Sequence, residues 1–254
     1  MHTGEFSKMQ EQGGYFWWYM ARNRLLKYAL EKNFKDRKDL NILDLASACG
    51  DNYPICNEYG TMIGIDLSDI SLKICKEKGL QSMVKGDVQV LPIKSKTVDV
   101  VIAFDIFEHL PEDEESMREV MRVLKDSGLL LVNVPAFMCL FSGHDEAFEH
   151  VRRYTSKEMK RKLKSAGFNV IKSSYWSFFL FPAVFLNRKL LARQKNNEEK
   201  KSDFHLKLPR VIEYVFSLIA DIEHALMVRG LVFPWGVSLF CVARKDIKNL
   251  EYKE

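Results

Sequence analysis

Carboxylates and small residues follow two apolar segments early in the chain. The first segment, 41–45, contains Asp44 and leads into the small-residue run ASACG at 46–50; the second, 61–65, leads into Asp66. Small residues let backbone amides approach a ligand, and the start of the following helix offers a partial positive charge. An acid after the next strand can bind both hydroxyls of a ribose. The spacing therefore predicts a nucleotide-type pocket at the carboxyl edge of a parallel sheet.

Histidine, arginine and tyrosine side chains gather in the stretch HDEAFEHVRRYT, which follows the fifth expected strand. His144 and His150 are candidates for a general base, because imidazole exchanges protons near neutral pH. Together with Arg153 and Tyr154, they could orient an anionic or hydroxylated acceptor. The alternative interpretation is that the arginines and Tyr154 brace this loop against the leading helix.

Alternating patterns between residues 41 and 176 define the elements that must position these side chains. The expected strands are 41–46, 61–65, 81–84, 98–104, 128–134 and 168–176, and the expected helices lie near 52–59, 69–78, 114–125 and 156–166. Such alternation predicts right-handed βαβ units and a parallel sheet. Asp126-Ser127-Gly128 indicates a turn, and Thr155 with Glu158 indicates a helix start.

The flanks of this core have their own patterns. An aromatic-rich helix is expected over 14–32, an apolar segment over 178–192, a charged loop over 193–203, a helix from Pro209 to about Val228, and a last strand over 236–244. The aromatic residues Trp17 and Trp18 could form a lid, or pack the leading helix on the core. The apolar segment could lie on a membrane surface or be buried against the later helix.

The length, composition and charge of the chain exclude few classes of protein. A chain of 254 residues with 47% hydrophobic residues and a formal charge of +4 is typical of one large α/β domain. Its five scattered cysteines, which form no C-x-x-C pair, favour reduced thiols and a cytoplasmic location. The apolar stretch from Tyr175 to Leu186 contains Pro182 and is shorter than the roughly 20 residues that a bilayer span requires. The mild charge argues against nucleic acid as a partner.

Several phrases in a fixed order carry a resemblance to a known family. They are ILDLASACG, GIDLS, GDVQVLP, VDVVIAFDIFEHLPEDEE, VLKDSGLLLVNVP, GHDEAFEHVRRYTSKEM and AGFNV. The chain resembles the class I S-adenosylmethionine-dependent methyltransferases, in particular their branch with an EHL-P phrase followed by an HDE and RRYT stretch. The resemblance implies a Rossmann-like three-layer α/β sandwich whose seven-stranded, mostly parallel sheet ends in an antiparallel strand inserted beside the fifth.

The resemblance also implies S-adenosylmethionine as cofactor and assigns roles to residues. The implied cofactor-binding residues are Asp44, Ala46, Ser47, Ala48, Gly50, Asp66, Leu67, Asp87, Val88, Phe104 and Asp105. We expect His144, His150 and Tyr154 to be catalytic, and Trp17, Trp18, His109 and Arg153 to bind the acceptor. Since methyl transfer displaces a methyl group from a sulfonium, the protein chiefly aligns the acceptor atom with it.

Metal use is open at this stage. Asp105, Glu108 and His109 form an acid-x-x-Glu-His pattern. Ubiquinone-pathway O-methyltransferases are similar here and use such residues for a divalent cation, and a carboxylate-rich site suits Mg²⁺. The other interpretation is that Glu108 and His109 pack or form hydrogen bonds after the strand.

One departure from the family pattern leaves a second function open. The family turn usually reads acid-x-Gly-x-Gly-x-Gly, whereas this chain has Ala46 and Ala48 at the first two glycine positions and keeps Gly50. Alanine at the second position adds a methyl group near the ligand and does not use positive φ freely. The sequence thus favours a methyltransferase for a small-molecule, sugar or lipid-like acceptor; the alternative is a non-catalytic binding or scaffold protein. Oligomeric state is not indicated.

We expect one methyltransferase domain over 1–254. Within it, 1–40 forms a helical lid, 41–176 the cofactor-binding core, 177–235 a helical insertion, and 236–254 the final strand and tail. Association with a membrane surface through the apolar segment remains an option.

Overall fold

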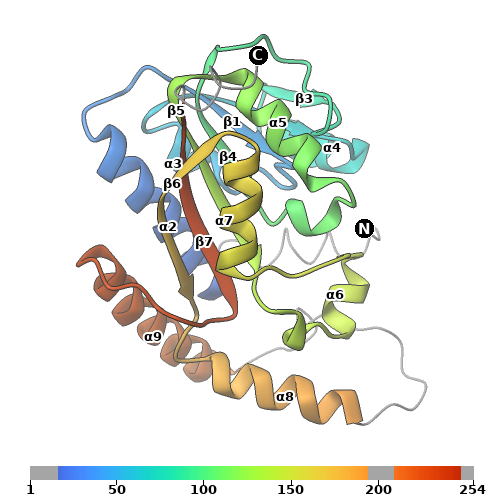
Figure 1. Cartoon of the computed structure of the whole chain (residues 1–254), viewed down its shortest axis with the longest axis vertical. Coiled ribbons are helices and arrows are strands. Elements are labelled where there is room, and N and C mark those ends of the chain that lie inside the picture. Colours follow the sequence, from blue (N-terminus) through green and yellow to red (C-terminus); the bar gives the residue numbers. More distant parts are fainter. Residues whose placement is uncertain (1–16, 194–208, 247–254) are drawn as a thin grey trace.

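The computed structural model describes residues 17–193 and 209–246. Within them, seven strands form one sheet in the order β3-β2-β1-β4-β5-β7-β6 (Figure 1). The strands are β1 (Leu40–Leu45), β2 (Gly60–Asp66), β3 (Met83–Lys85), β4 (Val98–Phe104), β5 (Leu124–Pro135), β6 (Phe168–Trp176) and β7 (Ser238–Lys245). The last strand pairs antiparallel with both β5 and β6, and the other pairings are parallel. The expected sheet, with its inserted antiparallel last strand, is confirmed.

Helices cover both faces of this sheet (Figure 1). They are α2 (Trp17–Phe34), α3 (Tyr53–Cys56), α4 (Asp69–Glu77), α5 (Asp113–Val123), α6 (Gly143–Ala147), α7 (Ser156–Ser165), α8 (Phe181–Arg193) and α9 (Arg210–Val228), with short 3₁₀ turns η1 (Phe107–His109) and η2 (Met138–Leu140). Residues of α2, α3 and α9 pack in one apolar cluster, and residues of α5 and α7 pack in the other. Because both faces are covered, the central strands are almost continuously apolar.

Local capping signals set the helix starts. The Thr155 hydroxyl accepts the Glu158 amide at 3.2 Å and so begins α7, as the sequence indicates. The Ser68 hydroxyl does the same for the Ser71 amide at the start of α4. Each bond satisfies one of the amide groups that a helix start leaves without an intrahelical partner.

Three boundaries differ from the sequence expectation. The expected turn at 126–128 lies inside β5 instead, because the strand already begins at Leu124; the pairing with β4 shifts register there and Ser127 has φ of 66°. The tripeptide thus forms a bulge in the strand rather than a break before it. The helix near 52–59 is only one turn long, and β3 begins at Met83 instead of 81.

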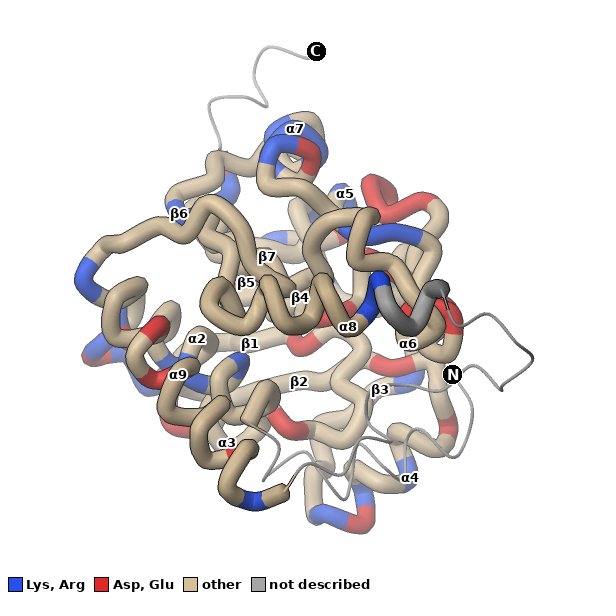
Figure 2. Tube along the Cα trace, turned by 90° about the horizontal axis from the view of Figure 1, so that it is seen from below, with Lys and Arg blue, Asp and Glu red and all other residues tan. Residues whose placement is uncertain are grey.

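The chain changes direction between β1 and β4. From β1 it winds outward through β2 to β3, and from β4 it winds the other way through β5. The carboxyl ends of β1 and β4 therefore diverge into a crevice, which is where open α/β sheets bind their ligands. Seen from below in Figure 2, α8 crosses in front of the sheet.

Candidate active site

A cavity of about 780 Å³ lies at the carboxyl edge of the sheet. Its volume is within the range of roughly 300–1,000 Å³ that is common for small-molecule sites. Most sequence-predicted residues line it: Trp17, Trp18, Ala46, Ser47, Ala48, Asp66, Leu67, Asp87, Val88, Phe104, Asp105, His109, His144, His150 and Arg153. Asp44, Gly50 and Tyr154 are not among its lining residues.

The turn after β1 adopts the glycine-like backbone in spite of its alanines. Ala46 and Ala48 have φ of 53° and 47°, and Gly50 has φ of 74°. Left-handed backbone disfavours an alanine by about 1–2 kcal/mol, so the turn is strained at two positions. Both alanines adopt positive φ, although alanine does so less freely than glycine. Gly50 is required for a further reason, since a Cβ there would meet the Leu80 side chain.

Asp44 orders this turn from beneath. Its carboxylate is buried and accepts hydrogen bonds from the Ser47 hydroxyl at 2.9 Å and the Asn52 amide at 3.0 Å. Burial raises the pKa of the Asp44 carboxyl to about 6, although both hydrogen bonds act in the other direction. These hydrogen bonds show that Asp44 orders the turn after β1.

Asp66 joins the turn to the second strand. Its two carboxylate oxygens accept the backbone amides of Ala48 at 2.9 Å and Ser68 at 2.8 Å. A carboxylate has about four lone-pair positions, so Asp66 keeps capacity for ligand hydroxyls. Leu67 beside it is exposed at the cavity wall. Ser68, and not Asp66, caps α4.

Asp87 and Val88 extend the same wall after β3. The Asp87 carboxylate accepts the Gln89 amide at 2.8 Å, which is the pattern of a turn aspartate. Val88 is buried except where it borders the cavity. The wall thus offers carboxylates next to apolar surface, as a purine nucleoside requires.

An arginine from α2 reaches the end of β4. The Arg22 guanidinium lies 3.1 Å from the Asp105 carboxylate, and Asn133 donates to the other carboxylate oxygen at 2.8 Å. The guanidinium also lies over the rings of Trp18 and Phe104, at 5.5 and 5.7 Å from their centroids. Such cation–π contacts, together with the ion pair, anchor α2 over the cavity. Sequence reasoning did not assign Arg22, because nothing local links it to a residue 83 positions away.

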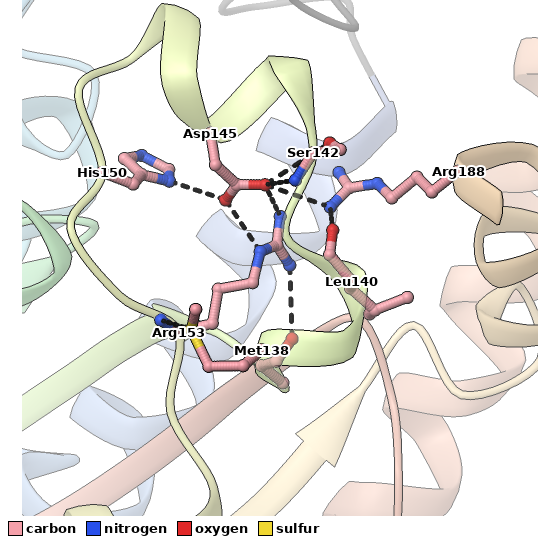
Figure 3. Close-up of polar contacts among 8 residues, drawn as sticks. Met138, Leu140, Ser142, Asp145, His150, Arg153 and Arg188 are labelled. Atoms are coloured by element: carbon pink, nitrogen blue, oxygen red, sulfur yellow. Dashed lines mark hydrogen bonds and ion pairs between the residues drawn. The ribbon is translucent and has the colours of Figure 1, made fainter. Parts of the chain in front are cut away.

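Asp145 is the centre of a buried network (Figure 3). The Arg153 guanidinium donates to both carboxylate oxygens at 2.7 and 3.0 Å, the Ser142 amide donates at 2.9 Å, and the Arg188 guanidinium of α8 lies at 3.6 Å. Burial alone would raise the pKa of Asp145. The hydrogen bond to His150 and the charge of Arg153 outweigh it and hold this pKa well below its usual range. Asp145 is therefore ionised throughout the neutral range.

The same carboxylate orients His150. The His150 Nδ1 lies 2.9 Å from Asp145 Oδ1 (Figure 3). Since an ionised carboxylate only accepts, Nδ1 carries the hydrogen, and Nε2 is the nitrogen left to exchange a proton. The rings of His109 and His144 lie at centroid distances of 4.7 and 6.2 Å from His150. All three histidines border the cavity.

Glu108 lies beside these imidazoles. Its side chain is buried, and neither carboxyl oxygen has a hydrogen-bond partner. Burial, with the neighbouring Asp105 carboxylate, raises the pKa of Glu108 well above its usual range. Burial also lowers the pKa of His109 to about 4, which keeps that imidazole neutral.

The structure groups a different set of possible metal ligands from the one that the acid-x-x-Glu-His pattern suggests. Ligand atoms of Glu108, His109 and His150 lie within 4.8 Å of one another. Asp105 is instead engaged by Arg22 and Asn133. A cation here would meet two imidazoles and one carboxylate, a donor set less suited to Mg²⁺ than the carboxylate-rich one expected from the sequence.

Tyr154 lies outside the cavity. Its buried hydroxyl donates to the Asp113 carboxylate at 2.6 Å, with the Phe107 carbonyl 3.0 Å away. Lys162 binds the other oxygen of Asp113 at 2.6 Å. Burial raises the pKa of the Tyr154 phenol far above its usual value. Tyr154 therefore braces the loop before α7 against η1 and α5, and not against the leading helix as the alternative interpretation expected; this position does not suit a base at the cavity.

Two charged residues of the site were given no role of their own from the sequence. Asp145 lies in the histidine-rich stretch that was expected to orient the acceptor, and Arg22 lies in the aromatic-rich leading segment, where its only signal was its charge. Both need tertiary partners to acquire a function.

Comparison with known proteins agrees with this geometry. Residues 43–132, less than half of the chain, match the family model described as a methyltransferase domain. The matched region contains β1, β2, β3 and β4 and most of β5, and so includes the wall of the cavity formed by the turn, Asp66 and Asp87.

The curated relatives that match this chain have low identity to it. An S-adenosylmethionine-dependent methyltransferase of Mycolicibacterium smegmatis is 28% identical and aligns over 50% of this chain and 51% of that protein. The ubiquinone/menaquinone biosynthesis C-methyltransferase UbiE of Campylobacter jejuni is 26% identical over 68% of this chain and 93% of that protein. The chain spans about half the length of the first curated relatives it matches.

Solved structures share the fold of this chain at low sequence identity. A chain from the complex between the Haloferax volcanii Trm112 methyltransferase activator and a methyltransferase superposes with a TM-score of 0.61 at 15% identity, covering 96% of this chain and 95% of that chain. Haemonchus contortus phosphoethanolamine N-methyltransferase 2, in complex with S-adenosyl-L-methionine, gives a TM-score of 0.56 at 16% identity, covering 87% and 52%. Over the described residues, no helix combines the length and apolarity that crossing a bilayer demands.

Proposed function

We propose that this protein is an S-adenosylmethionine-dependent methyltransferase. One observation carries the proposal: a single cavity brings together the strained turn after β1, the carboxylates that end β2 and follow β3, and a carboxylate-held histidine. The first two features suit an adenosine cofactor, and the third suits an acceptor that must lose a proton. The names of the relatives and the matched family model support the same chemistry.

The cofactor would lie along the turn and the ends of β2 and β4. Asp66 would bind the ribose hydroxyls, Asp87 the adenine amino group, and Leu67 and Val88 the faces of the ring. Phe104 and Asp105 would lie near the sulfonium, whose positive charge favours an aromatic ring or a carboxylate. When bound, the cofactor supplies the methyl group and its leaving group.

The acceptor would occupy the side of the cavity lined by Trp17, Trp18, His109 and the histidine loop. His150 would take the acceptor proton at Nε2 while Asp145 holds its other nitrogen, and His144 is the second candidate base. Arg153 would act by holding Asp145, because three of its nitrogens are already used within the protein. A hydroxyl acceptor on a small molecule, sugar or lipid-like compound fits this arrangement.

Calorimetry with S-adenosylmethionine and its demethylated product tests the proposal. We expect saturable heat with both, and a loss of affinity in Asp66→Ala of about tenfold or more, since one charged hydrogen-bonding group is worth about 1.5–3 kcal/mol. Asp69→Ala, which removes an exposed carboxylate on α4 that binds Lys85, is the matched control and should leave affinity unchanged. No heat with either ligand would refute the proposal.

The two alanines support a second candidate, a non-catalytic scaffold that retains the fold. Ala46 and Ala48 border the cavity and hold φ values that glycine adopts without strain. Ala48→Gly separates the two functions. Cofactor binding that appears only in this variant would identify the natural protein as a scaffold, whereas binding by both proteins would support the enzyme.

A further inference from the structure

Helix α9 carries an apolar stripe on the side that faces away from the protein. The stripe consists of Val211, Tyr214, Val215, Leu218 and Ile222, and all five side chains are exposed. Intervals of three and four residues place them on one face of the helix. The buried side chains of α9, Glu223 and Met227, fall on the opposite face. The helical pattern groups these residues on one face, and the fold leaves that face uncovered.

The apolar surface continues past the end of α9. Leu231, Val232 and Trp235 in the following loop are exposed, as is Phe179 before α8. Phe178 stacks on Trp235 at 5.0 Å, which fixes this loop against the segment that leads into α8. Contiguous exposed apolar surface of this kind marks an interaction site more often than a free surface. We call the stripe and these four residues the α9 face.

Positive charge brackets the α9 face. Arg210 begins the helix and Arg229 caps its end, and both are exposed. The acid nearest the stripe, Asp221, is neutralised by Arg24 at 2.8 Å. An apolar face with cations at its ends is complementary to an anionic lipid surface, which attracts each arginine that lies near it.

The same charges disfavour a second copy of the chain as the occupant. Two α9 helices packed antiparallel would place Arg210 of one copy near Arg229 of the other, and parallel packing would place each arginine near its own equivalent. Like charges brought together at an interface oppose binding. A bilayer with anionic headgroups instead accepts all of these arginines at once.

Helix α9 lies between its exposed stripe and the cavity. Phe216, on the side of α9 opposite the stripe, lines the cavity, and on α8 the exposed Ala183 and Asn187 and the half-buried Val184 do so as well. Leu186, also on α8, is exposed. Figure 1 shows α8 and α9 together at the end of the molecule where the β6 and β7 strands meet their connecting loops. A ligand leaving a bilayer bound at the α9 face would reach the cavity between these two helices.

We propose that the α9 face docks on an anionic membrane surface and that the acceptor is an amphiphile taken up from it between α8 and α9. The membrane docking is argued from the exposed α9 face alone and does not depend on the proposed methyltransferase function. The assignment of the acceptor rests on the proposed methyltransferase function, and it deepens that function by naming a membrane-resident substrate class.

Sedimentation of the full chain with vesicles tests the docking. The vesicles are phosphatidylcholine alone, or phosphatidylcholine mixed with phosphatidylglycerol. We expect binding to the mixed vesicles that weakens as salt is added, and little binding to phosphatidylcholine alone. Val211→Glu should reduce binding to mixed vesicles about tenfold, because it removes apolar contact and adds a repelled charge.

Val90→Glu is the matched control. Val90 is 73% exposed and Val211 is 74% exposed, so the same substitution changes the same amount of surface. Val90 lies in the loop after β3, away from α8 and α9. An acid in the first turn of α9 also suits the helix dipole, so Val211→Glu does not weaken the helix. Far-UV circular dichroism confirms that both variants are folded.

Equal vesicle binding by the two variants, or no binding by the native chain, would overturn the docking. A native dimer that Val211→Glu converts to monomer, measured by light scattering, would overturn it too, since the stripe would then be a protein interface. Calorimetry with S-adenosylmethionine separates the two proposals. Vesicle binding without cofactor binding would support the membrane docking and refute the methyltransferase function. Cofactor binding without vesicle binding would support the methyltransferase function and refute the membrane docking.

Discussion

The two walls of the cavity are held together in different ways. On the wall of the β1 turn, the partners of Asp44 are Ser47 and Asn52, close by in the chain. On the opposite wall, Asp145 is contacted from α8 by Arg188 and from the loop before α7 by Arg153. The first wall depends on backbone conformation and short-range hydrogen bonds. The second depends on charges brought together from separate elements, so a single substitution there should affect more of the structure.

The two buried carboxylates also respond to their surroundings in opposite directions. Asp44 meets neutral donors, and burial raises its pKa to about 6. Asp145 meets guanidinium groups and an imidazole, which hold its pKa well below its usual range despite burial. Both side chains are fully enclosed, which shows that the charge of the partners, and not burial itself, decides the ionisation state.

Removing the charge of Asp145 should have the largest effect. Asp145→Asn leaves the buried Arg153 and Arg188 without their counter-charge, and we expect a loss of about 3–5 kcal/mol in the free energy of unfolding. Chemical denaturation measures it. Asp39→Asn, which breaks an exposed contact with Arg37, is the control and should leave stability unchanged. A loss no larger than the control's would show that the network does not stabilise the acceptor wall.

The pH dependence of stability should separate Asp44 from Asp145. The folded pKa of Asp44 is about 6 and the unfolded value is about 3.9, so the native state binds the extra proton between these values and its stability falls as pH rises from 4 to 6. The amplitude is up to about 3 kcal/mol. Asp44→Asn should remove this slope in denaturation curves measured across that range.

Asp145 should act in the opposite sense. Its folded pKa is depressed, so its contribution is fully present above the unfolded value of about 3.9 and is lost as pH falls below it. If the free energy of unfolding of Asp44→Asn still fell between pH 4 and 6, the contrast between the two walls would not hold.

Asp66→Ala should lower the free energy of unfolding less than Asp145→Asn does. It leaves the amides of Ala48 and Ser68 without an acceptor, but both lie at the cavity, where water can replace the carboxylate. We expect a loss of about 1–2 kcal/mol in the free energy of unfolding. A loss equal to that of Asp145→Asn would mean that the first wall is as dependent on charge as the second.

The smallest effect should come from relieving the strained turn. Ala48→Gly removes a left-handed alanine, which should stabilise the fold by about 1 kcal/mol. Ala225→Gly, the same change at an exposed position in the last turn of α9, should instead destabilise the fold. Thermal melts of the two variants should therefore shift in opposite directions. A shift of the same sign would show that the turn is not strained.

Most element positions could be predicted because they follow from local patterns, whereas the seven-stranded sheet with its inserted antiparallel strand and most of the cavity residues were predicted from the family resemblance. The hydroxyls of Thr155 and Ser68 cap the helices that follow them. The continuously apolar strands indicate a sheet that is buried on both faces. The bulge at Ser127 was missed because the residues DSG have the same composition as a turn. Tyr154 was expected at the cavity, and only the packing around Asp113 shows that its hydroxyl points elsewhere.

The order of strands, the acids at their ends and the small-residue turn are properties of the sequence by itself, since short-range sterics, capping and hydrophobic periodicity suffice to specify them. Tertiary structure alone decided that Arg22 would pair with Asp105, that two arginines would converge on Asp145 and orient His150, and that the apolar stripe of α9 would face outward. Those outcomes depend on charges and surfaces from distant segments meeting in space, and the strength of such interactions is set by burial and distance, which no local pattern records.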